Sequence, residues 1–149
     1  VAALQTELFP LAALITPNLP ELQVIADTNI NNEAAMANTA VAVSQRFNVN
    51  VLGKGGHFGD EANDVLAMTD GSSQWFKGQR IDNPNTHGTG CTLSSAIAAN
   101  LAKGYALEDA IWLAKDYLTG ALLDGMNLGK GSGPLNHGFA LSGDFFAAG

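Results

Sequence analysis

The amino-acid sequence predicts an α/β fold, in which helices cover a sheet. Three observations support this prediction. Runs of strand and helix length follow one another in the order strand, helix, helix, strand, hairpin, helix, helix. A glycine-rich octet, Asn85–Thr92, lies between a strand-like run and an apolar helical run. Of the 149 residues, 46% are hydrophobic, which is typical of a globular domain that buries a core.

Composition and charge exclude several classes of function. The net charge is −7, so we expect no binding to nucleic acid, which needs clustered Lys and Arg. No apolar run reaches the length of a membrane span, so we expect no membrane partner. The one cysteine, Cys91, cannot form an internal disulfide, which favours the reducing cytoplasm. Because the chain begins at Val1 rather than Met, we expect an upstream part to be missing.

The first elements are bounded by prolines. Val1–Leu8 is typical of the end of a helix that Pro10 stops. Leu11–Thr16 is an apolar run of strand length. Pro20 suits the first turn of a short helix that continues to Ala26. These residues predict a helix end, a strand and a helix.

A longer helix and a second strand follow. Asn31 or Asn32 can cap a helix over Glu33–Phe47, and Val49–Leu52 is a short strand that runs into Gly53–His57. Apolar residues recur in the helix every three to four positions, as expected for a buried stripe. They are Ala35, Met36, Ala40, Val43 and Phe47.

The rest of the chain predicts a hairpin and two helices. Asn63–Met68 and Gln74–Ile81 are strand-like and are joined by the turn Asp70–Ser73. A helix from Thr92 ends near Lys103 and Gly104, and a second runs from about Leu107 to Asp124. The buried stripe of the second helix is predicted to be Ala110, Leu113, Ala114, Tyr117, Leu118 and Ala121.

The octet Asn85–Thr92 is the strongest functional signal. Its glycines open onto a helix N-terminus, where free amides and the helix dipole favour an anion, usually phosphate. Cys91 stands in the first turn of that helix, where a thiolate is favoured, so it is a candidate base or nucleophile. The alternative is a simple strand-to-helix turn in which Cys91 is a small buried residue.

Two further sites each allow a functional and a structural interpretation. Asn18 and Glu21 follow a strand and could hold hydrated magnesium near phosphates, or they could form a helix capping box. Lys54 lies between glycines at a strand end, where it could reach a phosphate, or it could be a solvated lysine in a flexible turn.

Four stretches together resemble one family, the bifunctional hydroxymethylpyrimidine and phosphomethylpyrimidine kinases of thiamine biosynthesis. They are Ile15–Glu21, Lys54–His57, Asn85–Ser94 and Gly131–His137, and their order and spacing match as well. The resemblance implies the C-terminal part of a ribokinase-like three-layer α/β/α sandwich. It covers only the C-terminal half of such a kinase, so residues 1–149 are expected to be a single partial domain.

The resemblance also implies roles for individual residues. Cys91 would occupy the position of the catalytic base, and the backbone of Gly88, Thr89 and Gly90 would form the anion hole for the transferring phosphoryl group. Asn18 and Glu21 match the Asn-x-x-Glu that sets magnesium. Four residues are expected to bind ATP, namely Lys54, Gly56, Thr86 and His137.

The implied activity is ATP-dependent phosphorylation of 4-amino-5-hydroxymethyl-2-methylpyrimidine and its monophosphate, with Mg²⁺. The family's N-terminal half, which carries most of the pyrimidine pocket, is absent from these residues. We therefore expect a homodimer or pairing with the missing half. Two alternatives are a pyridoxal kinase-like enzyme, since some of these share the cysteine-containing loop, and a non-catalytic nucleotide-binding remnant.

Overall fold

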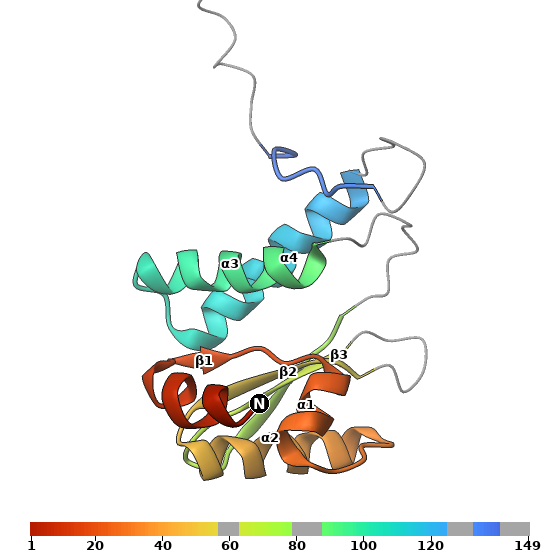
Figure 1. Cartoon of the computed structure of the whole chain (residues 1–149). Helices are drawn as coiled ribbons and strands as arrows, with labels where there is room; N and C mark the ends of the chain where they lie inside the picture. Colours follow the sequence, from red (N-terminus) through yellow and green to blue (C-terminus); the bar gives the residue numbers. More distant parts are fainter. Residues whose placement is uncertain (57–62, 79–87, 125–132, 141–149) are drawn as a thin grey trace, which may run out of the picture. The chain divides into compact units, whose positions relative to one another are not determined.

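The structure is a computed structural model that describes residues 1–56, 63–78, 88–124 and 133–140 (Figure 1). The chain forms two compact units, Val1–Arg80 and Ile81–Gly149, which are described one at a time below. The predicted α/β class is confirmed, because the first unit contains a mixed sheet with helices packed on it. No helix of the described ranges is both long and apolar enough to span a bilayer.

The sheet of the first unit has four strands within the described residues, in the order β1-β2-β3-β4. Strand β1 (Leu14–Ile15) pairs in parallel with β2 (Asn50–Gly56). Strands β3 (Asn63–Ala67) and β4 (Ser73–Phe76) continue the sheet in antiparallel fashion and form the predicted hairpin. The parallel pair brings the carboxyl ends of β1 and β2 to the same edge of the sheet, where open α/β sheets bind ligands.

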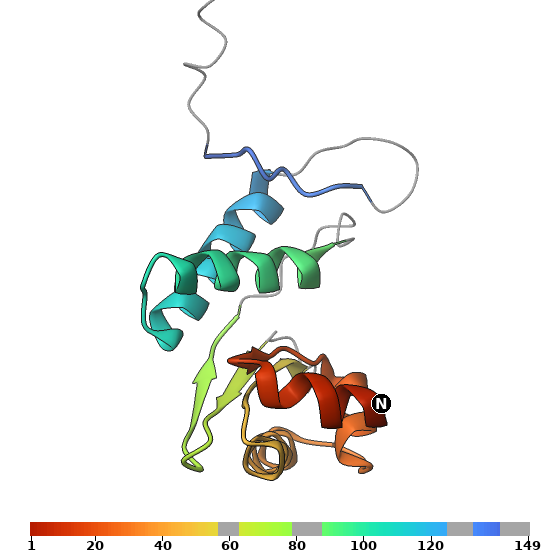
Figure 2. The same cartoon turned by 60° about the vertical axis from the view of Figure 1, so that its left-hand side comes forward.

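Two α-helices follow β1 in the chain. Helix α1 spans Leu19–Ala26, and helix α2 spans Glu33–Phe47, the range that the sequence predicted. Helix α2 packs on β2 and β3, and Figure 2 shows it nearly end-on beside the sheet. The apolar faces of the two helices pack against the sheet and form a buried core cluster. Its residues are Leu22, Ile30, Met36, Ala40, Val43, Val51, Val65 and Ala67.

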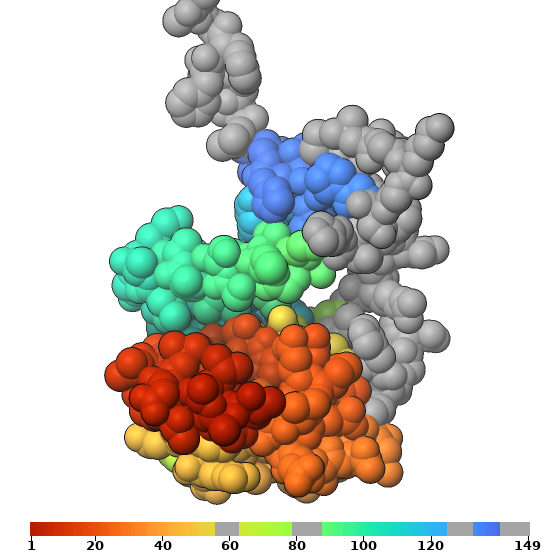
Figure 3. Space-filling view, viewed as in Figure 1, coloured from red at the N-terminus to blue at the C-terminus, as the bar shows by residue number. Residues whose placement is uncertain are grey.

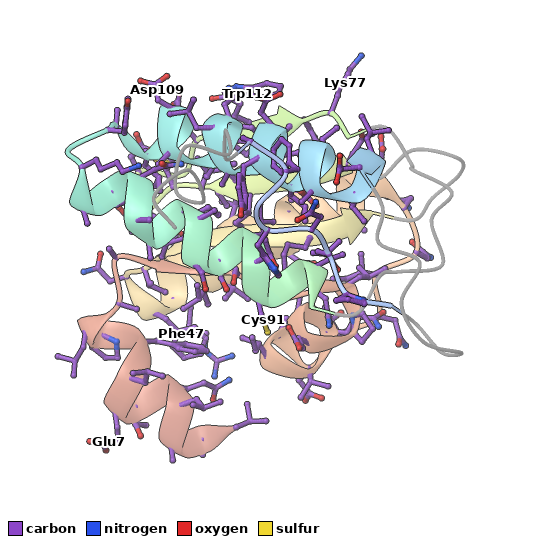
Figure 4. All side chains as sticks on the ribbon, turned by 90° about the horizontal axis from the view of Figure 1, so that it is seen from above. Glu7, Phe47, Lys77, Cys91, Asp109 and Trp112 are labelled. Atoms are coloured by element: carbon purple, nitrogen blue, oxygen red, sulfur yellow. The ribbon has the colours of Figure 1, made fainter. Side chains whose placement is uncertain are left out.

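The N-terminal residues are helical, but the helical segment does not stop at Pro10. A π-helical segment, η1 (Leu4–Leu8), continues into a 3₁₀ turn, η2 (Phe9–Leu11), which contains Pro10. Proline fits there because the first turn of a helix leaves its amides unpaired anyway. The ring of Phe9 meets that of Phe47, which Figure 4 labels, edge to face with centroids 5.5 Å apart.

The second unit is a pair of packed helices. Helix α3 spans Thr89–Ala102 and helix α4 spans Leu107–Asp124. Gly104 has φ +90°, as expected of the residue that follows a helix C-cap. The fully or nearly buried apolar side chains of this pair are Leu93, Ile97, Ala110, Ile111, Ala114 and Ala121.

Several predicted strand boundaries were wrong. β1 is limited to Leu14–Ile15, because Leu11 belongs to the 3₁₀ turn. β2 does not end at Leu52 but continues to Gly56, with a shift of register between Gly53 and Gly56. β4 ends at Phe76, whereas the prediction ran to Ile81; residues 79–81 lie outside the described ranges.

The predictions for the helices failed in two details. α3 begins at Thr89 rather than near Thr92, because Gly88 takes the N-cap position and Gly90 is helical. In α4, Leu113 was predicted to be buried but is 42% exposed, while Ile111 is fully buried. The buried stripe of α4 is therefore turned away from Leu113 and toward Ile111.

The sheet leaves little room for a side chain at Gly53. A Cβ atom built there would lie 3.1 Å from Met36 Cε, 3.3 Å from Val65 Cγ1 and 3.4 Å from Leu22 Cδ2. We expect Gly53→Val to lower the free energy of unfolding by about 1–3 kcal/mol, because it overpacks this core. Urea unfolding measures the change, with Ser73→Val on the exposed edge of β4 as the control. A Gly53→Val chain as stable as the control would contradict the packing.

Candidate functional site

The first turn of α3 presents backbone amides that have no acceptor inside the helix. Gly88 is the N-cap and has φ +85° and ψ 2°, a left-handed conformation that glycine adopts readily. The first bond of the helix ladder runs from the Thr92 N–H to the Gly88 carbonyl, at 2.8 Å. The N–H groups of Thr89, Gly90 and Cys91 precede it. This geometry suits an anion.

The early start of α3 changes the place of the predicted residues. Thr89 and Gly90 lie in the first helical turn and not in the loop before it, and Cys91 lies in that turn as predicted. Cys91 is exposed rather than buried, and Figure 4 labels it at the start of α3. This excludes the alternative in which Cys91 is buried filler. Thr86, predicted to bind the nucleotide, lies outside the described residues.

A groove of about 650 Å³ runs along α3 from this first turn. Gly88, Cys91 and Thr92 line one end of it, and His137 and Tyr117 line it too. The structure therefore brings His137 to the same groove as the predicted anion hole, although 45 residues of sequence separate His137 from Thr92.

His137 is held on two sides. Its Nε2 lies 3.0 Å from Thr92 Oγ1, a hydrogen-bonding distance in which the direction depends on the tautomer. The Tyr117 hydroxyl donates a hydrogen bond to the His137 carbonyl, at 2.7 Å. The imidazole edge that bears Nε2 thus contacts the protein itself, and the sequence motif that assigns His137 to the nucleotide does not predict this contact.

In the first unit, the structure brings Asn18, Glu21 and Lys54 together. Asn18 forms a parallel bridge with Lys54, just beyond the paired part of β1 and β2. The Lys54 N–H donates to the Pro17 carbonyl at 2.8 Å. All three residues are therefore at the carboxyl end of the parallel strand pair.

Asn18 and Glu21 form a complete capping box on α1. Asn18 Oδ1 accepts the Glu21 N–H at 2.8 Å, and Glu21 Oε2 accepts the Asn18 N–H at 2.8 Å. The capping alternative is therefore confirmed. It leaves the second carboxylate oxygen of Glu21 outside the box, on an exposed side chain.

A metal ion at this place would need ligands from elsewhere. The described ranges contain no cluster of three or more His, Cys, Asp or Glu side chains suited to a metal. Mg²⁺ is usually bound by one or two carboxylates together with phosphate oxygens and waters. Glu21 and Asn18 fit that pattern as contributors to a shared site, but not as a cage of their own.

A buried carboxylate that the sequence analysis missed supports the Lys54 segment. Asp64 on β3 is 6% exposed, and its Oδ1 accepts the Gly55 N–H at 2.9 Å. Gly55 has φ +71°, and Gly56 pairs with Asn63 beyond the register shift. The glycines at 53, 55 and 56 therefore belong to a bulged strand rather than to a free turn. An aspartate inside an apolar strand is the signal that could have revealed this.

Comparison with known proteins gives a consistent result. Residues 1–136 match the family model described as phosphomethylpyrimidine kinase. A hydroxymethylpyrimidine/phosphomethylpyrimidine kinase of Streptomyces coelicolor is 44% identical over 140 residues, which are 93% of this chain and 51% of that protein. The chain thus spans about half the length of the curated relatives that it matches.

Solved kinases share the fold. The ADP complex of Bacillus subtilis pyridoxal kinase superposes with a TM-score of 0.83 at 33% identity, over 92% of this chain and 54% of that one. Phosphomethylpyrimidine kinase from Clostridium difficile 630 gives a TM-score of 0.65 at 36% identity, over 79% and 46% of the two chains. These neighbours have the ribokinase-like fold.

The capping box and a magnesium role at Glu21 can be separated by Glu21→Gln. Glutamine can keep the bond to the Asn18 N–H, so stability should stay within about 0.5 kcal/mol of wild type. Loss of the charge should weaken the magnesium dependence of ADP binding. Urea unfolding and ADP titrations at several Mg²⁺ concentrations measure the two effects.

Asn32→Ala is the matched control for this experiment. It removes the cap of α2, where Asn32 Oδ1 accepts the Ala35 N–H at 2.8 Å, and should cost about 1 kcal/mol. It should leave the magnesium dependence unchanged. If Glu21→Gln also leaves it unchanged, capping is the only role of Glu21.

Proposed function

The chain belongs to the phosphomethylpyrimidine kinase family, and we propose that it is the C-terminal, phosphate-binding part of an ATP-dependent kinase. The proposed substrates are 4-amino-5-hydroxymethyl-2-methylpyrimidine and its monophosphate, on the route to thiamine diphosphate. The observation that carries the proposal is the first turn of α3, where a glycine N-cap leaves helix amides free for an anion.

The roles of the residues follow from phosphoryl transfer, in which catalysis is mostly positioning and charge stabilisation. The amides of Thr89 and Gly90, with the backbone of Gly88, would hold the oxygens of the transferring group. Cys91, exposed beside them, would take the proton of the attacking hydroxyl or bond to its oxygen.

The nucleotide would engage the remaining predicted residues. Lys54, Gly56 and His137 are proposed to lie near ATP, and the proposal gains support from the ADP complex of the B. subtilis neighbour. Bound Mg²⁺ would supply positive charge to the phosphate oxygens. Asn18 and Glu21 would orient its water ligands, because the capping box fixes both side chains.

A further part of the proposal is that a second polypeptide segment completes the kinase, either the family's N-terminal half or another copy of the chain. The first unit exposes large apolar residues on its N-terminal turns and on α1, and three of them, Val1, Leu4 and Val24, line one pocket. Large exposed apolar patches often mark interaction sites. Figure 3 shows these turns in red. The exposed residues are Val1, Leu4, Leu8, Leu11 and Val24.

Two other functions stay in competition. A pyridoxal kinase-like activity is favoured by the B. subtilis neighbour, at 33% identity. The other alternative is a nucleotide-binding remnant without catalysis. A cytoplasmic location is also part of the proposal, since it rests on the lone cysteine and on the cellular supply of ATP.

The proposal predicts that the chain binds Mg-ADP. Ligand at 10 to 100 times its Kd should raise the free energy of unfolding by about 1.4 to 2.7 kcal/mol. A thermal-shift titration, with ADP alone and Mg²⁺ alone as controls, measures this. A folded sample that shows no shift at millimolar Mg-ADP would contradict an intact phosphate site.

Turnover then distinguishes the candidates. The chain should release ADP near background with either hydroxymethylpyrimidine or pyridoxal, because the substrate half is absent. The N-terminal half of the S. coelicolor kinase should restore release with the pyrimidine, whereas the corresponding half of the B. subtilis pyridoxal kinase should restore none with pyridoxal. Restoration only by the pyridoxal kinase half would favour the pyridoxal kinase alternative, and strong turnover by the 149 residues alone would contradict the need for a second half.

The role of Cys91 is tested by Cys91→Ala. Mg-ADP affinity should stay within about twofold, because the anion donors are backbone amides. Turnover of the complemented kinase should fall by about 10² to 10⁴, the usual contribution of a general base. Cys91→Asp places a carboxylate there and should recover part of the rate. Full turnover in Cys91→Ala would show that the base lies elsewhere.

A further inference from the structure

The segment 133–140 is fastened to the α3–α4 pair by contacts that the proposed function does not use. Leu135 is 3% exposed. The rings of Phe139 and Tyr117 meet with centroids 5.4 Å apart. A Cβ at Gly120 would lie only 2.4 Å from the Phe139 ring, so the ring rests directly on the backbone of α4. The burial of Leu135 and the packing of Phe139 on α4 thus hold the segment on both sides of His137.

Three polar contacts hold the middle of the segment: Asn136 Nδ2 donates to Asp124 Oδ2 at the end of α4, and the other two lie at the groove. Thr92 is 9% exposed, and its Oγ1 is 3.0 Å from His137 Nε2. The Tyr117 hydroxyl holds the His137 carbonyl from α4. A neutral imidazole has one donor and one acceptor nitrogen, and a hydroxyl can serve either, so the Thr92–His137 bond forms in both tautomers.

The position of Thr92 also connects this bond to the candidate anion site. Thr92 is the residue whose N–H makes the first helix bond to Gly88, directly after the free amides of Thr89, Gly90 and Cys91. Its hydroxyl therefore ties His137 to the same helical turn that presents the anion donors. His137 and Tyr117 line the groove that begins at this turn.

We propose that Thr92 and Tyr117 are positioning residues, which hold His137 as a fixed wall of the groove beside the anion-binding turn. The groove's ligand is the Mg-nucleotide of the proposed function, on which this inference rests. Neither residue touches the reacting atoms. Their effect is to order residues 133–140 before the ligand arrives, so that binding does not have to supply the cost of ordering them.

The test uses Thr92→Val, which keeps the shape of the side chain and removes its hydroxyl. Hydrogen–deuterium exchange of the 133–140 peptide, without nucleotide, should be about fivefold faster than in wild type, the effect of one net hydrogen bond. Thr92→Ser keeps a hydroxyl and should exchange like wild type. Tyr117→Phe keeps the ring contact with Phe139 and should also exchange faster.

The matched control is Thr119→Val on α4. Thr119 Oγ1 donates to the Lys115 carbonyl at 2.8 Å on an exposed helix face, so this variant also removes a threonine hydroxyl from the second unit. It should leave exchange of residues 133–140 unchanged. Unchanged exchange in Thr92→Val, on a folded sample, overturns the proposal.

Calorimetric titration with Mg-ADP separates positioning from stability. Thr92→Val should bind about fivefold more weakly, while Thr92→Ser and Thr119→Val bind like wild type. If affinity in Thr92→Val matches wild type, the wall has no role in binding and the inference is wrong. If wild type itself does not bind Mg-ADP, the proposed function fails and so does the ligand assigned to this groove, whereas the exchange result reports the fastening independently.

Discussion

The free amides at the start of α3 are the constraint on which the candidate site depends. Helices α1 and α2 begin with asparagine caps, whose side chains accept an N–H of the first turn. Helix α3 begins with Gly88, which has no side chain to offer. Since unpaired amides at a helix start favour an acceptor, α3 is the helix of these three that is prepared for an external anion. The exposed thiol of Cys91 stands at that same turn.

The sequence predicted those parts in which local chemistry and packing agree. The caps and apolar stripe of Glu33–Phe47 gave α2 its exact range, and the turn around Gly71 gave the hairpin. The capping box on α1 was also foreseen, as an alternative to metal binding. In each case the signal lies within a few residues of the element that it defines.

The failures have long-range causes. The glycines after Leu52 indicate a turn by propensity, but pairing with β3 and the Asp64 bond to Gly55 keep them in the sheet. Glycine lowers helix propensity, so the helix was expected to start after Gly90, whereas it starts before it. The contact between Thr92 and His137 joins segments that are distant in the sequence, and no local sequence pattern predicts it.

The acidic character of the chain is compatible with the proposed phosphate site because of where the charges act. A net charge of −7 repels phosphate at long range, but salt screens exposed charges beyond about 8 Å at physiological ionic strength. The donors of α3 are neutral amides at hydrogen-bond range, where their direction matters more than the distant field. Lys54, tied through its backbone to Pro17, supplies a positive charge in the first unit without adding to a basic surface. A backbone-built site would therefore let an acidic protein bind a phosphate selectively, while the net negative charge repels polyanions at long range.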